Sequence, residues 1–132
     1  MATNPKFGGT PRVACAIVDA TLDTSLTAPT HSATVITGVA AGTKIEEIVI
    51  EGLGTTVAAV CNIFLYDGTT YHLYDQVLIT AVTSSTTAIA FRRVRTYENL
   101  MLADNTWSLR YTQTVAGNQS LLKMTVTGED LT

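Results

Sequence analysis

Two β-rich runs flank an Asp-Gly pair in the segment Cys61-Asn62-Ile63-Phe64-Leu65-Tyr66-Asp67-Gly68-Thr69-Thr70-Tyr71-His72-Leu73. An Asp-Gly pair supplies the positive backbone angles that a tight hairpin turn needs. We therefore predict a β-hairpin whose turn is Tyr66-Asp67-Gly68-Thr69.

Side chains alternate between the two faces of a strand, so the hairpin has a predictable inner face. On the first arm this face holds Cys61, Ile63 and Leu65. On the second arm we expect it to hold Tyr71, Leu73, Val77 and Ile79. The opposite face of the second arm carries His72, Tyr74 and Gln76, which should meet solvent or a partner.

Similar short runs recur about every ten residues, the spacing of an all-β sandwich or barrel. We expect eight or nine strands, at residues 13–18, 33–37, 44–51, 57–66, 70–80, 86–94, 97–102, 106–115 and 120–127. Residues 1–12 hold two prolines and a Gly-Gly pair without periodicity, which predicts an extended N-terminal arm. The remaining residues, 13–132, form a single predicted domain.

Composition agrees with one compact all-β domain. The chain has 132 residues, of which 46% are hydrophobic and 14% charged, so it should fold rather than remain disordered. It has 24 threonines against 3 lysines, and β-branched threonine favours strands. Trp107, Leu109 and Tyr111 alternate with polar residues, as do Leu122, Met124 and Val126, which is typical of half-buried antiparallel strands.

Charge and hydropathy exclude two classes of partner. A net charge of −3 provides no positive field for nucleic acid. No apolar run approaches the roughly 20 residues that span a bilayer, and residues 1–12 lack the apolar core of a secretory signal. We therefore expect a soluble protein that binds neither nucleic acid nor membrane.

Residues for catalysis, cofactors or metals are sparse. His31 and His72 are the only histidines, and Cys15 and Cys61 stand among apolar residues, which predicts two buried free thiols. No phosphate-binding glycine motif opens a helix, and Asp67 and Asp104 are explained as turn formers. We expect no enzyme activity, no cofactor and no metal site.

Several segments together resemble a known family: Lys44-Ile45-Glu46-Glu47-Ile48, Cys61 to Gly68, Tyr71-His72-Leu73 and Trp107-Ser108-Leu109-Arg110. Over residues 40–128 their order resembles the jelly-roll cement, or decoration, proteins that bind the outside of tailed-bacteriophage heads. The motifs are strand and hairpin patterns, not catalytic signatures.

The resemblance implies an antiparallel jelly-roll sandwich that is made in the host cytoplasm and lies on the outer surface of the capsid. Its partners would be the major capsid protein and further copies of itself, as a dimer or trimer. By bridging capsid subunits of an icosahedral head, it would stabilise the expanded shell.

The predicted interface residues fall into three groups. The arm contributes Lys6, Phe7, Pro11 and Arg12. Arg92, Arg93 and Arg95 form the one basic cluster, either a solvated strand face or a docking patch for an acidic surface. Tyr74 and Tyr97 are the candidate aromatic anchors.

Two other functions fit the same pattern. A tail or baseplate accessory protein would share the β-rich strands and the arm. A carbohydrate-binding β-sandwich module would use exposed aromatics, for which Tyr66, Tyr71 and Tyr74 are available around the hairpin.

Overall fold

A computed structural model describes residues 9–118 and 120–131 of the chain. The described residues form eight β-strands and no helix, so no helix in this part of the chain could cross a membrane. The strands are β1 (Thr10–Ile17), β2 (Ala33–Thr37), β3 (Thr43–Gly52), β4 (Ala59–Tyr66), β5 (Tyr71–Ile79), β6 (Arg92–Leu102), β7 (Ser108–Gln113) and β8 (Leu122–Asp130).

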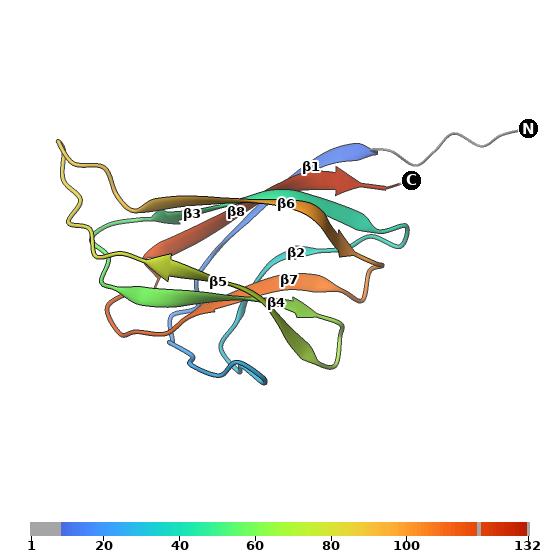
Figure 1. Ribbon diagram of the computed structural model, residues 1–132, viewed down its shortest axis with the longest axis horizontal. Helices are drawn as coiled ribbons and strands as arrows, with labels where there is room; N and C mark the ends of the chain where they lie inside the picture. The colour runs from blue at the N-terminus through green and yellow to red at the C-terminus, as the bar shows by residue number, and fades with distance from the viewer. Residues whose placement is uncertain (1–8, 119, 132) are drawn as a thin grey trace, which may run out of the picture.

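The strands form two antiparallel sheets packed face to face (Figure 1). One sheet has the order β1-β8-β3-β6 and the other β2-β7-β4-β5. Except at the β4–β5 hairpin, each strand is followed by one in the opposite sheet. This order is that of a jelly roll, the sandwich built from two Greek keys. The prediction of an all-β antiparallel sandwich is therefore confirmed.

The core lies between the sheets and is made by alternate residues of each strand. Ile45, Ile48 and Ile50 of β3 face Ile63 and further apolar residues of the opposite sheet, all fully buried. The predicted inward residues of β7 and β8 are also there: Leu109, Tyr111, Leu122, Met124 and Val126 have no exposed surface, and Trp107 packs at the margin.

The predicted hairpin is present between β4 and β5. Asp67 accepts hydrogen bonds from the backbone N–H groups of Thr69 and Thr70, at 2.8 and 2.7 Å. Gly68 has a φ of +97°, in the region that glycine tolerates and other residues rarely adopt. The hairpin is therefore where the Asp-Gly pair predicts it, but its loop is Asp67–Thr70, one residue further along the chain than the predicted turn, and of the pair only Gly68 has a positive φ.

The predicted inner face of β5 is wrong for Tyr71 and Leu73. Ile63 pairs with Asp75 but Phe64 pairs with Leu73, so Tyr74 is an extra residue in a β-bulge. One unpaired residue reverses the alternation beyond it. Val77 and Ile79 are buried in the core as expected, whereas Tyr71 and Leu73 lie on the outer face.

Three other predictions need correction. Residues 10–12 of the predicted arm belong to β1 and pair with Gly128–Asp130 of β8, while residues 1–8 lie outside the described residues. The predicted strands at 86–94 and 97–102 are one strand, β6, preceded by a loop that pairs with no neighbour over 86–90. Cys15 is exposed because its side chain points outward from β1, and only Cys61 is buried.

Candidate functional site

Two predicted residues, Tyr74 and Tyr97, meet where the edge strands β5 and β6 of opposite sheets approach each other. Their ring centroids are 5.5 Å apart in a T-shaped arrangement. The Tyr97 hydroxyl donates a 2.9 Å hydrogen bond to Asp75 Oδ2, and Arg95 Nε lies 3.6 Å from the same oxygen. We call Tyr74, Asp75, Arg95 and Tyr97 the β5–β6 cluster.

The charges of this cluster are largely compensated within it. Burial and the hydrogen bond to Asp75 raise the pKa of Tyr97 far above its usual value, so its hydroxyl remains a donor. Arg95 shares Asp75 with Tyr97 and also donates to the Gln76 carbonyl oxygen at 3.2 Å. Tyr74, at 44% exposure, is the member whose side chain is most open to a partner.

The three arginines of β6 do not form one patch. Arg92 is exposed and stands in register with Glu51, on the outer face of its sheet. Arg93 and Arg95 alternate to the other side of the strand, where Arg93 lies 6.0 Å from the centroid of the Phe91 ring. A docking patch made of all three side chains would therefore have to span an edge of the sandwich.

Arg12 is held by its own domain. Its Nη1 donates to the Thr37 carbonyl oxygen at 2.7 Å and to Asp130 Oδ1 at 3.1 Å. It thereby joins β1 to the end of β2, on the side of the sandwich opposite the β5–β6 cluster. Pro11 is exposed on β1. Lys6 and Phe7 lie outside the described residues.

Sequence reasoning missed a cluster on the outer face of the sheet β2-β7-β4-β5. The guanidinium of Arg110 lies 4.3 Å from the Tyr66 ring centroid, donates to the Tyr71 hydroxyl at 3.1 Å and to Ser108 Oγ at 3.0 Å. The rings of Tyr66 and Tyr71 are 4.3 Å apart and inclined by 36°. Hairpin pairing of Tyr66 with Tyr71 could have revealed the two rings, but the arginine comes from β7, 39 residues after Tyr71.

Apolar side chains continue this face beyond the aromatic rings. Leu73 pairs with Phe64, and Leu78 pairs with Val60, which places both leucines on the outer side. They are 38% and 59% exposed. This half of the sandwich therefore presents tyrosine, arginine and leucine side chains together to solvent.

The outer face of the sheet β1-β8-β3-β6 is also partly apolar. Val13 and Ile17 of β1 are 70% and 52% exposed, and Val94 of β6 is 37% exposed. Between them the register places Thr125 and Thr127 of β8. Charged residues interrupt this face: Ile17 is followed across the sheet by Lys123, Glu51 and Arg92, and Glu47 stands beside Thr127.

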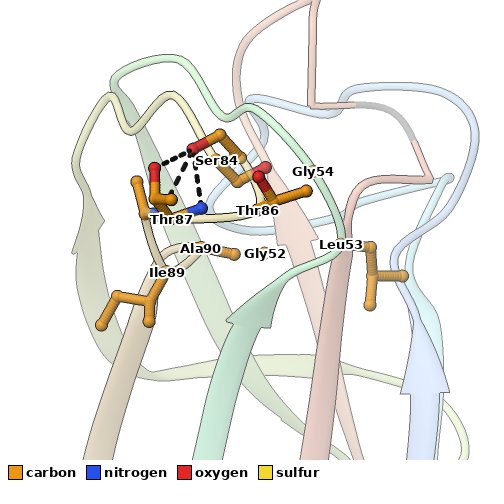
Figure 2. A pocket seen from close by; sticks show the side chains of 10 residues that line it. Gly52, Leu53, Gly54, Ser84, Thr86, Thr87, Ile89 and Ala90 are labelled. Atoms are coloured by element: carbon orange, nitrogen blue, oxygen red, sulfur yellow. Dashed lines mark hydrogen bonds between the residues drawn. The ribbon is translucent and has the colours of Figure 1, made fainter.

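An open groove of about 510 Å³ lies between the β3–β4 loop and the β5–β6 loop, lined by residues 52–54 and 84–90 (Figure 2). The Ser85 hydroxyl accepts hydrogen bonds from the backbone N–H groups of Thr87 and Ala88, which shapes the loop internally. Ile89 points away from this turn and is 86% exposed, more than any other large apolar side chain described. This loop projects at the end of the sandwich remote from the chain termini (Figure 1).

Both histidines lie close to a carboxylate of their own domain. His72 Nε2 lies 3.0 Å from Asp67 Oδ2, and its ring stacks against Trp107 with centroids 5.9 Å apart. His31 is exposed in the β1–β2 loop, with Nδ1 4.0 Å from Asp19. No group of three or more His, Cys, Asp or Glu side chains arranged to hold a metal ion occurs among residues 9–118 and 120–131.

No protein-family model and no curated protein matches the chain. Two chains from solved structures of infectious bursal disease virus match it. The chain of the T13 viral particle is 16% identical, with a TM-score of 0.30, over 98% of this chain and 35% of that chain. The chain of the Gt strain is 18% identical, also with a TM-score of 0.30, over 96% of this chain and 35% of that chain. The present chain thus spans about a third of the length of the chains that it matches.

Proposed function

We propose that this protein is a structural component of a virion and, more specifically, a cement protein on the outer surface of an icosahedral phage head. The jelly-roll topology and the resemblance of residues 40–128 to such proteins both support this role. The proposed partners are the major capsid protein and further copies of the chain. Neither a cofactor nor catalysis is required for this function.

The observation that carries the proposal is the exposure of large apolar side chains on both outer faces. Val13 and Ile17 expose 70% and 52% on one face, and Leu78 exposes 59% on the other. Single exposed apolar residues are common, but clustered ones rimmed by polar residues indicate contact with other proteins. A protein with two such faces can contact two neighbours at once.

The protein would act by reinforcing the capsid shell mechanically. A molecule that bridges adjacent capsid subunits buries additional surface at each junction. If its binding surface spans subunits that are correctly spaced only in the expanded shell, binding stabilises that state by mass action. The low lysine content suits this role, since fewer long side chains lose entropy on docking.

The test is co-sedimentation of the purified protein with expanded heads that lack it, followed by heating. We expect saturable binding that raises the temperature at which the heads disrupt. A variant lacking residues 1–8 tests the arm, because a longer deletion would remove the paired residues of β1. Loss of head binding with unchanged thermal unfolding of the free protein would place residues 1–8, the segment that contains Lys6 and Phe7, at the interface.

Point variants can separate the two faces. Leu78→Lys introduces charge on the outer face of the sheet β2-β7-β4-β5, and Val94→Lys is the matched change on the other sheet. The face that contacts the capsid should be the one whose variant binds heads more weakly. Equal, full binding by both variants would contradict the use of either position.

The two alternative functions predict different results in the same binding experiments. Incorporation into tails rather than heads would identify a tail or baseplate accessory protein. Retention on a glycan array would identify a carbohydrate-binding module, for which the Tyr66, Tyr71 and Arg110 cluster is the relevant surface. Either result, without binding to heads, would refute the cement function.

A further inference from the structure

Three of the four edge strands of the sandwich are protected against strand addition. β2 has only five residues and a register shift. β5 contains the Tyr74 bulge, and its Gln76 carbonyl oxygen is bound by Arg95. β6 carries three arginines, and its pairing with β3 shifts register. Short length, bulges and charged side chains are the usual means by which sheets block their edges.

The fourth edge strand, β1, has none of these devices over most of its length. It pairs with β8 through eight consecutive residues, without a register shift. Val13, Cys15 and Ile17 project outward, and none carries a charge. β1 is thus a long, regular and largely uncharged edge at one side of the sandwich (Figure 1).

The backbone of β1 has unused hydrogen-bonding groups along this edge. The Val18 N–H donates to the Leu122 carbonyl oxygen at 2.8 Å, so Val18 points its backbone groups toward β8. Because these groups alternate in direction along an antiparallel strand, those of Val13, Cys15 and Ile17 point away from β8. No described residue forms a hydrogen bond with them.

We propose that a second copy of this chain pairs with this edge, β1 against β1 in antiparallel orientation, with the two-fold axis at Cys15. In this register Val13 of each copy stands opposite Ile17 of the other, and Cys15 stands opposite Cys15. All three residues then use both outward backbone groups. The β1-β8-β3-β6 sheets of the two copies then become one continuous eight-stranded sheet.

The sequence of β1 selects this register and this partner. Pro11 lacks an N–H group, so a register that pairs Pro11 loses a hydrogen bond, whereas the register centred on Cys15 pairs only residues with a donor. The outward side chains are self-complementary: two Val-Ile pairs flank the central Cys-Cys pair. A surface that contacts itself about a two-fold axis must have this property.

This inference concerns contacts between copies of the chain and does not depend on binding to a head. It is tested with the purified protein alone. Sedimentation velocity over a range of micromolar concentrations should show a dimer. A short bismaleimide should link two chains through Cys15, which is exposed, and Cys15→Ser should abolish the link while leaving the dimer in sedimentation.

The double variant Val13→Lys/Ile17→Lys should raise the dimer dissociation constant about 100-fold, since it places like charges close together across the axis. Val94→Lys is the matched control, because it lies on the same outer face but on the far edge strand. The control should remain dimeric. Circular dichroism checks that each variant is folded, and cross-linking of the unaltered chain gives a result independent of the variants.

Two results would overturn the proposal. One is a chain that remains monomeric at all concentrations. If heads then protect Cys15 of this monomer from maleimide, a strand of the capsid, not a second copy of this chain, pairs with β1. The other is a dimer that persists in the double-lysine variant or cannot be linked through Cys15, which would place the self-contact elsewhere.

Discussion

The Tyr97 hydroxyl donates a 2.9 Å hydrogen bond to the carboxylate of Asp75, and this bond joins the edge strands of two different sheets. On the opposite side of the sandwich, Arg12 of β1 reaches the Thr37 carbonyl oxygen of β2. Polar contacts therefore close both open sides of a sandwich whose interior is apolar. These contacts hold in place the surfaces proposed to bind other proteins.

Replacing Tyr97 with phenylalanine should destabilise the fold by about 1–2 kcal/mol, because it removes a hydrogen bond to a charged and partly buried acceptor. Urea unfolding should show a lower midpoint with an unchanged slope. Tyr74→Phe is the matched control, since no described residue bonds to the Tyr74 hydroxyl. An equal loss in both variants would show that the Tyr97–Asp75 bond contributes no specific stability.

The sequence predicted the sheets better than it predicted how they meet. Alternation and the Asp-Gly turn identified the hairpin, and alternation identified the inward faces of β7 and β8, because these signals are local. The bulge at Tyr74 is not local: it depends on how β5 pairs with β4. That one extra residue moved Tyr71 and Leu73 to the outer face.

The other features that the sequence did not predict also depend on contacts between segments far apart in the chain. Residues 86–90 are rich in β-branched side chains, yet they form a loop, because strand preference is realised only where a neighbouring strand is available. The sequence identifies Tyr74 and Tyr97 separately as aromatic candidates, but their contact arises from the packing of two sheets. The cluster around Arg110 was missed since it unites β4, β5 and β7.

Gly68→Ala should destabilise the protein by about 1 kcal/mol, because φ at this position is positive and a Cβ atom makes that conformation unfavourable. The added atom would have space, since its nearest neighbour, the Thr106 carbonyl oxygen, is 3.4 Å away. Gly54→Ala, at an ordinary backbone angle with no contact nearer than 3.6 Å, is the control. Thermal unfolding of both variants separates backbone strain from crowding.

The free energy of unfolding should fall as the pH is lowered from about 4 toward 2, because unfolded aspartate has a pKa of about 3.9. The Thr70 backbone N–H, the His72 side chain and the Thr69 N–H lower the pKa of Asp67 to about 2. Burial opposes such a shift at Asp23, but backbone N–H groups of Ser25, Thr30 and His31 outweigh it and lower its pKa. A depressed pKa adds stability above the unfolded value, and that stability is lost on acidification.

Urea unfolding at pH 7, 4 and 2.5 tests this dependence. Asp23→Asn should be less stable than the unaltered protein at pH 7 and should lose less on acidification. Asp19→Asn is the control in the same loop, because Asp19 accepts one backbone hydrogen bond, from the Thr21 N–H at 2.9 Å, and its other contact, to His31 Nδ1, is longer at 4.0 Å. Parallel acid profiles for Asp23→Asn and the unaltered chain would exclude Asp23 as a source of the pH dependence.

The two thiols should differ sharply in reactivity. Cys15 is exposed on β1, whereas burial and then the charge of Asp75 raise the pKa of the Cys61 thiol far above its usual value. A thiol reagent at pH 8 should therefore modify one cysteine per folded chain and two in denaturant, counted by mass spectrometry. Cys15→Ser should leave no reactive thiol in the folded state. Rapid labelling of Cys61 in the folded Cys15→Ser protein would instead mean that the core between the two sheets opens readily.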